Sequence, residues 1–364
     1  MSNVPKNKYE QAIYKLVADM FQISAIYQTT DDTILTLIPM YEKKRSIDML
    51  EDRMKLAGYT YSLQESDDTI TLKISTKPSI KIPRLNIFLF VVTLLSIYIV
   101  PVLIQKAYAL SSFSMKEIIL NTYETLLTGR NIIFTIAMIS ILFVHEMGHF
   151  IASRYRNIIT SWPYFIPAPN MIGTFGAIIK SKSPFWNRRD LIEVGAWGPI
   201  AGWIIALGWT IYGILTAHVE PMLRQPDSGF LGEPLIFKIL TGIFIHTSSD
   251  NFSIVINEPL FAGWVGMLVT ALNMLPIGQL DGGHIVYGLI RKKQHLVAYV
   301  ALAVLIVLGF QSEIWWLFAL MGIIFGIKHP PTLNDSFKLS KVAIVLAVSS
   351  LIILILSFTP VPFH

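Results

Sequence analysis

Two histidines and a glutamate stand close together at a helical spacing. Residues 145–149 read His-Glu-Met-Gly-His. In an α-helix residues i and i+4 share a face, so His145 and His149 can reach one metal ion, while Glu146 lies one step around the helix. From there the Glu146 carboxylate can accept a proton from a water molecule at the metal. The motif therefore supplies two zinc ligands and a general base.

The motif lies inside an apolar segment. Residues 132–144 carry no charge, and the apolar run continues through residues 150–152. Together they are long enough to cross a bilayer, and ionisable residues within such a span are costly and usually functional. The alternative is structural: both histidines bonded to carbonyl groups and Glu146 paired with an arginine. Because this spacing rarely arises by chance inside an apolar span, we favour the metal site.

The composition indicates a membrane protein. The chain of 364 residues is 53% hydrophobic and 15% charged, and it contains no cysteine. Any metal site must therefore use His, Asp or Glu ligands, and no disulfide framework is available. The net charge of +5 comes from basic residues that mostly flank apolar spans. That placement is explained by membrane topology, so nucleic acid is not an expected partner.

The sequence divides into a small soluble domain, residues 1–80, and a membrane domain, residues 81–364. The first domain is predicted to be α+β and contains no catalytic constellation, so a regulator docking on it is only a default role. The predicted helices cover residues 9–20 and 44–57, and the predicted strands cover residues 34–39, 59–64 and 69–75.

The second domain is predicted to be α-helical and polytopic, with about seven transmembrane spans. They are expected near residues 85–105, 131–152, 195–217, 261–280, 296–310, 313–327 and 342–358. Arg84, Arg154 and the basic run 291–293 fall on one side, which by the positive-inside rule is the cytoplasm. The N-terminus is then cytoplasmic and the C-terminus external. At 1.5 Å per residue, His149 lies about 8 Å from Arg154, close to the cytosolic leaflet.

Catalytic zinc usually has three protein ligands, so a third ligand is needed. A metzincin would continue with Gly and His where this chain has Ala152 and Tyr155, which excludes that class. Glu193 is one candidate, although it could be a boundary charge at the start of a span. Asp281 is better placed.

The segment around Asp281 predicts a broken helix. Pro276, Gly278, Gly282 and Gly283 surround it and should interrupt an apolar helix there. Broken helices at membrane depth are tolerated mainly where they line a cavity or are buried in protein. The alternative for Asp281 is an ordinary helix N-cap in a turn at the membrane edge.

With both segments considered, the chain resembles the site-2 proteases, which are intramembrane zinc metalloproteases. The resemblance rests on the motif 145–149 and on Asn273-x-x-Pro-x-x-x-Leu-Asp281-Gly, and covers residues 131–288. It is most similar to the branch named for ethylene-dependent gravitropism deficiency, through residues 164–169 and 173–177. The resemblance implies one Zn²⁺ per chain held by His145, His149 and Asp281.

The resemblance also implies roles for residues around the metal. Glu146 would be the general base, and Asn273 would hold the substrate backbone or the developing oxyanion, with packing or helix capping as its alternative. A second set resembles the family's re-entrant β-hairpin, whose edge could pair with an extended substrate. That set is Gly173, Thr174, Phe175, Gly176 and Ala177, and its alternative is a surface loop. His284 is expected near the site but not as a ligand.

These observations predict an endopeptidase that cuts membrane-anchored proteins near the cytosolic leaflet, in regulated intramembrane proteolysis. Its partners would be a transmembrane substrate and the lipid bilayer. A non-proteolytic zinc-binding scaffold or chaperone is the alternative, and Glu146 argues against it because a structural site needs no base. A transporter is the third class, but no internal repeat is evident. The lack of an Arg/Ser-rich leader favours a prokaryotic cell membrane over a plastid.

Overall fold

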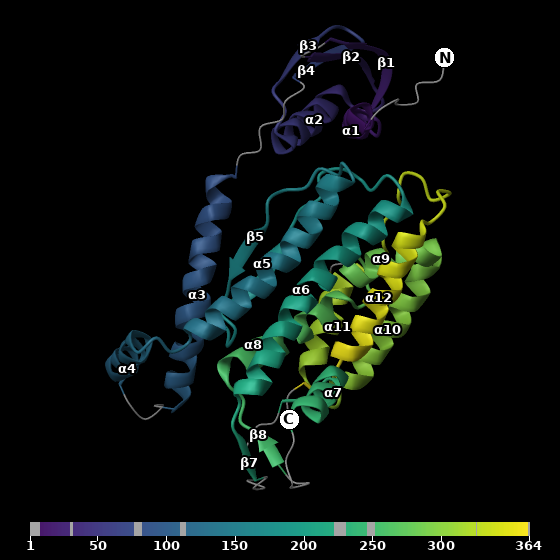
Figure 1. The fold of residues 1–364 in the computed structure, drawn as a ribbon. Helices are drawn as coiled ribbons and strands as arrows, with labels where there is room; N and C mark the ends of the chain where they lie inside the picture. The colour runs from purple at the N-terminus through teal and green to yellow at the C-terminus, as the bar shows by residue number, and fades with distance from the viewer. Residues whose placement is uncertain are drawn as a thin grey trace.

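The computed structural model describes residues 8–29, 32–75, 82–109, 114–221, 231–245, 252–324 and 326–362. It consists of a small α+β unit at one end and a bundle of helices below it (Figure 1). The described chain ends at the opposite end of the bundle from the α+β unit. The domain boundary expected at residues 80 and 81 lies outside the described residues.

The α+β unit is an antiparallel sheet of order β1-β2-β4-β3 with two helices on one face (Figure 1). Alternate residues of β4, namely Ile70, Leu72 and Ile74, point into the core and are fully buried. The predicted elements are present, and β1 is a strand that the sequence interpretation missed. The bounds are α1 (Lys8–Val17), β1 (Phe21–Gln28), β2 (Asp32–Pro39), α2 (Lys43–Ala57), β3 (Tyr61–Glu65) and β4 (Ile70–Ser75).

The bundle contains ten helices within the described residues. They are α3 (Arg84–Ala109), α4 (Met115–Leu127), α5 (Ile132–Tyr155), α6 (Arg188–Thr216), α7 (Leu235–Phe244), α8 (Glu258–Asn273), α9 (Asp281–Ile290), α10 (Gln294–Gly309), α11 (Ile314–Ile324) and α12 (Lys341–Ser357). Two short antiparallel pairs accompany them, β5 (Tyr164–Pro167) with β6 (Thr174–Ile178), and β7 (Val219–Pro221) with β8 (Phe252–Ile254). Helix α6 is central and packs against α5, α8, α9 and α12.

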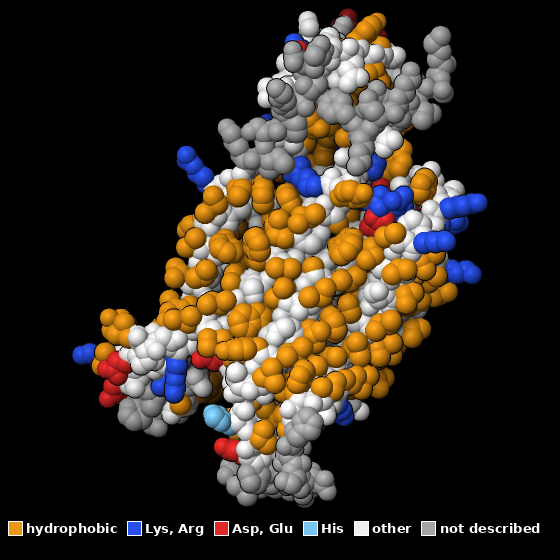
Figure 2. All heavy atoms as spheres, viewed as in Figure 1, with side chains coloured by type: hydrophobic (Ala, Val, Ile, Leu, Met, Phe, Trp, Pro, Cys, Tyr) orange, Lys and Arg blue, Asp and Glu red, His pale blue; other side chains and the backbone are white. Residues whose placement is uncertain are grey.

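Four helical runs among the described residues are long and apolar enough to cross a membrane: α3, α5, α6 and the run 281–309. The remaining expected spans coincide with shorter helices, α8, α11 and α12, of 16, 11 and 17 residues. A span needs about 20 residues, so seven spans remain a prediction. Figure 2 shows hydrophobic side chains covering the bundle, with Lys and Arg gathered at the end that carries the α+β unit.

The predicted break before Asp281 is present. Helix α8 ends at Asn273, and α9 begins at Asp281 after a turn in which Gly278 has φ +53°. Gly282 and Gly283 do not interrupt a helix as expected, because they form the first turn of α9. They are required there for close packing, since a Cβ at either position would overlap the backbone of residues 274–278.

The α+β unit is bound to the bundle through the buried side chain of Arg53. Arg53 is 1% exposed, and its guanidinium pairs with both carboxylate oxygens of Asp19 and donates to the carbonyl oxygen of Lys182 at 2.8 Å. Ile159, from the segment after α5, is part of the apolar core of the α+β unit. The unit is therefore packed against the segments that follow α5 and β6.

Replacing Arg53 with Met should loosen this unit, because Asp19 would lose its partner in a largely buried site. We expect the free energy of local opening, measured by hydrogen exchange at β4 amides of the full chain in detergent, to fall by about 3 kcal/mol. Arg45→Met on the exposed face of the same helix is the matched control and should change it by less than about 0.5 kcal/mol. Equal protection in the two variants would contradict the assignment.

Candidate metal centre

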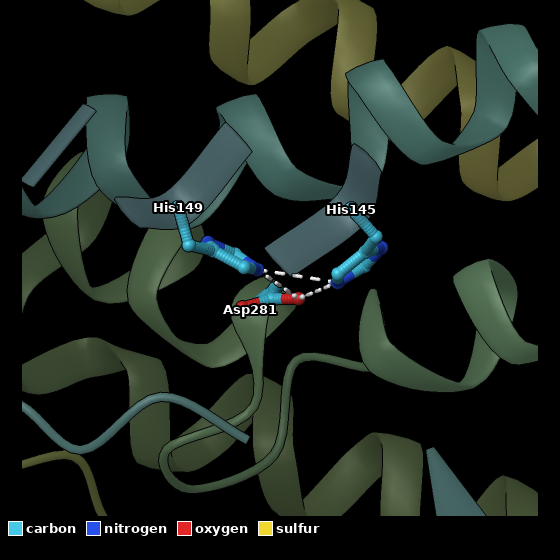
Figure 3. Close-up of side chains that lie close together, drawn as sticks. All are labelled: His145, His149 and Asp281. Atoms are coloured by element: carbon cyan, nitrogen blue, oxygen red, sulfur yellow. Dashed lines mark hydrogen bonds and ion pairs between the residues drawn. The ribbon is translucent and has the colours of Figure 1, made fainter. Parts of the chain in front are cut away.

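The two histidines of α5 and the aspartate that begins α9 face one another in the structure (Figure 3). The Nε2 atoms of His145 and His149 lie 3.2 Å apart. One carboxylate oxygen of Asp281 lies 3.5 Å from the first nitrogen and 3.3 Å from the second. The predicted ligand set is thus brought together from two helices far apart in the sequence.

These separations fit a tetrahedral zinc ion. Nitrogen and oxygen ligands bind zinc at about 2.0–2.1 Å, which places tetrahedral ligand atoms about 3.3–3.4 Å from one another. The three measured distances span 3.2–3.5 Å. The residues present can therefore hold a zinc ion without rearrangement.

The hydrogen bonding of His149 also favours a cation. Its Nδ1 lies 2.8 Å from the carbonyl oxygen of Val194, which can only accept, so Nδ1 carries the proton. In the neutral ring Nε2 then presents a lone pair toward the Asp281 carboxylate. Two acceptors facing each other in a buried site repel, and a metal ion between them removes that repulsion.

Close backbone packing between α5 and α6 holds the two histidines. A Cβ added at Gly148 would lie 2.6 Å from the carbonyl oxygen of Trp197, so only glycine permits this approach. On α6, a Cβ at Gly198 would overlap the His149 imidazole, and one at Gly202 would lie 2.9 Å from the Cβ of His145. The sequence interpretation did not identify these glycines, whose spacing of four residues on α6 was the available signal.

The metal centre opens into a cavity of about 590 Å³. Glu146 is 6% exposed and lines it, as the motif geometry predicted. Asn273 also lines the cavity, with its amide nitrogen 3.5 Å from Nε2 of His145. The structure thus places the expected base and the expected amide at the metal site, where both line the cavity.

One wall of the cavity follows the β5–β6 pair. Ala177 and residues 178–182 line it, whereas Gly173, Thr174, Phe175 and Gly176 lie in the turn and the outer part of β6. Gly173 has φ +82°, and a Cβ there would lie 2.5 Å from Cα of Ile97, so the turn is packed on α3. Of the five predicted substrate-binding residues, the structure brings Ala177 to the cavity and extends the wall toward Lys182, which the sequence did not suggest.

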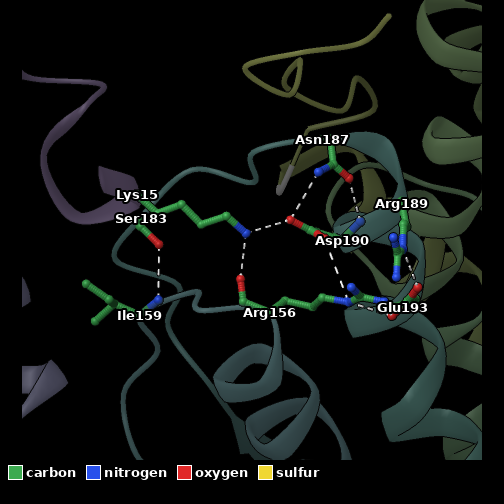
Figure 4. A network of polar contacts seen from close by, with 8 residues as sticks. All are labelled: Lys15, Arg156, Ile159, Ser183, Asn187, Arg189, Asp190 and Glu193. Carbon is green, nitrogen blue, oxygen red and sulfur yellow. Dashed lines mark hydrogen bonds and ion pairs between the residues drawn. The ribbon is translucent and has the colours of Figure 1, made fainter. Parts of the chain in front are cut away.

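Glu193 is placed away from the ligand set. One carboxylate oxygen is bonded to Arg156 and the other accepts from Arg189 at 3.0 Å (Figure 4). The neighbouring Asp190 binds Lys15 of the α+β unit at 3.0 Å. The alternative third ligand therefore belongs to an ion-pair network that joins α6 to the segment after α5.

Replacing Gly198 with Ala should displace the His149 imidazole and weaken zinc binding about 100-fold, judged by competition with a chelator in detergent. Gly208→Ala is a matched control on the same helix, because a Cβ there meets nothing within 4 Å. The control also corrects for the higher helix propensity of alanine. If the two variants bind zinc equally well, the packing of His149 against Gly198 is not required for zinc binding.

Known proteins that are similar to this chain include probable zinc metalloproteases, in agreement with a zinc site. Residues 133–308 match the model of Peptidase family M50. Probable zinc metalloprotease EGY1, chloroplastic, of Arabidopsis thaliana is 31% identical over 233 residues, 62% of this chain and 42% of that protein. Probable zinc metalloprotease EGY2, chloroplastic, of the same plant is 31% identical over 157 residues, 42% of this chain and 28% of that protein. No solved structure matches the chain.

The chain spans less than half the length of these relatives. Both are plant chloroplastic proteins, so they lend no support to a prokaryotic membrane or to a cytoplasmic N-terminus. The family expected from the sequence is confirmed: this chain carries a peptidase M50 domain of the site-2 protease type and is homologous to the EGY zinc metalloproteases.

Proposed function

We propose that this chain is an intramembrane zinc endopeptidase that cuts membrane-anchored proteins near the cytosolic leaflet. One observation carries the proposal. Three ligand atoms lie at the mutual distances expected around one zinc ion, and together with Glu146 they line a cavity beside an extended strand. A zinc ion held there would polarise the scissile carbonyl and lower the pKa of a bound water.

The surrounding side chains supply the rest of the chemistry. Glu146 accepts the proton of the attacking water and later returns it to the leaving amine. Asn273 donates from its amide to the substrate backbone or to the developing oxyanion. Both residues line the cavity, so both can reach a peptide bond placed there.

A transmembrane helix must unwind before its peptide bonds can be cut, and the released backbone groups need partners. The sheet formed by β5 and β6 has two strands among the described residues, so β6 keeps one edge without a strand partner. Ala177 and Ile178 of β6 line the cavity. We therefore assign this edge as the surface on which an unwound substrate segment adds a strand.

The place of the site along the bundle supports the proposed topology. His149 lies in the last two turns of α5, toward the end that carries the α+β unit and the gathered Lys and Arg side chains (Figures 1 and 2). By the positive-inside rule that end is cytosolic. Water then reaches the metal from the cytosol, and a regulator can dock on the α+β unit.

Replacing Glu146 with Gln tests the function. The amide keeps the size of the side chain but cannot take a proton, so cleavage of single-span substrates should fall by about 10²- to 10⁴-fold, while zinc per chain stays at the parent value. The purified parent and variant are compared in detergent with a panel of such substrates. Zinc in both with no cleavage by either would favour the scaffold or chaperone function, and no zinc in either would refute the metal site.

Proline at Ile178, or at Ala177, tests strand addition. Successive N–H groups of a strand point to opposite sides, so one of these two prolines removes an N–H from the free edge of β6 and should abolish cleavage while leaving zinc content unchanged. Ile178→Val keeps the N–H and a β-branched side chain, so it should cleave within a few-fold of the parent. Unimpaired cleavage by the proline variants would show that the substrate does not pair with β6.

A further inference from the structure

His284 lines the catalytic cavity, and the proposed reaction gives it no role. It lies one helical turn after Asp281 on α9, and its ring packs against Phe185 with centroids 5.5 Å apart. A Cβ at Gly195 of α6 would lie 2.9 Å from the Cβ of His284. The ring is therefore fixed in place by both helices and by the segment that follows the cavity wall.

A second histidine holds one nitrogen of this ring. Nδ1 of His284 lies 2.6 Å from Nε2 of His329, which belongs to the segment between α11 and α12. Nδ1 of His329 lies 2.5 Å from the carbonyl oxygen of Pro330, an acceptor only, so that nitrogen carries the proton. Burial lowers the pKa of His329 to about 4, so the ring is neutral at pH 7 and its Nε2 accepts.

The direction of these hydrogen bonds fixes the tautomer of His284. Because Nε2 of His329 accepts, Nδ1 of His284 donates, and the neutral His284 ring is left with a lone pair on Nε2. No other described residue makes a hydrogen bond to Nε2. The cavity is thus lined by an oriented acceptor that needs a donor.

We propose that Nε2 of His284 accepts a hydrogen bond from a backbone N–H of the unwound substrate. This assignment rests on the proposed peptidase function. An extended peptide points successive N–H groups to opposite sides, so those that do not face β6 need another acceptor. A backbone N–H left without a partner away from water is costly. His284 is therefore a substrate-binding residue, held in the accepting tautomer by His329.

The test uses tripeptide hydroxamates, because the hydroxamate chelates zinc and the peptide presents its N–H groups without being cut. In a series of these probes, each amide in turn is replaced by an ester, which removes one N–H. Affinity is measured for the zinc-loaded parent, His284→Ala and His284→Gln, with His295→Ala as a control histidine that does not line the cavity. Zinc content is measured for every variant.

We expect one ester to bind the parent and His295→Ala about three- to tenfold more weakly than its amide, as for one lost hydrogen bond. His284→Ala should bind that amide and ester equally, and His284→Gln, whose amide oxygen can accept, should restore part of the difference. The same amide–ester difference in His284→Ala at every position would overturn the proposal, as would loss of zinc from both His284 variants. Failure of the parent to bind any probe would refute the peptidase site itself.

Discussion

The geometry of the metal centre follows from close backbone contact between α6 and the two helices that carry the ligands. Gly148, Gly198 and Gly202 let α5 and α6 approach until the histidine rings rest on the α6 backbone. Small residues at such contacts are the usual means of bringing helices together within a membrane, where lipid is as apolar as the protein interior. Because the rings touch backbone atoms, their positions do not rely on flexible side chains.

The same packing explains how ionisable groups are tolerated within an apolar span. A lone carboxylate or imidazole in an apolar span is costly, but here two imidazoles and the Asp281 carboxylate face one another at separations that suit one divalent ion. The carbonyl of Val194 on α6 holds His149 in the tautomer that directs Nε2 toward Asp281. Helix α6 therefore sets both the position and the hydrogen-bonding state of a ligand that it does not carry.

The cavity wall is held from two sides. The turn before β6 packs on α3 at Gly173, and Asn86 of α3 donates to the carbonyl oxygens of Trp162 and Pro163. At the other end of the wall, Arg53 of the α+β unit holds the carbonyl of Lys182. The extended segment beside the metal centre is thus anchored both to a membrane helix and to the α+β unit, which links the position of that unit to the shape of the cavity.

The local chemistry could be predicted from the sequence alone. The spacing of His145 and His149 places both on one helix face, and Pro276 and Gly278 end α8 before Asp281; both effects follow from the backbone geometry of a few consecutive residues. Apolar runs gave the places of the long helices but not how many are long enough to span, because helix length depends on where breaks fall. The tertiary fold was needed to choose between Asp281 and Glu193, to show that the cavity wall extends to Lys182, and to pair His284 with His329. Each of these depends on contacts between segments far apart in the chain, and no local pattern specifies which surfaces will meet.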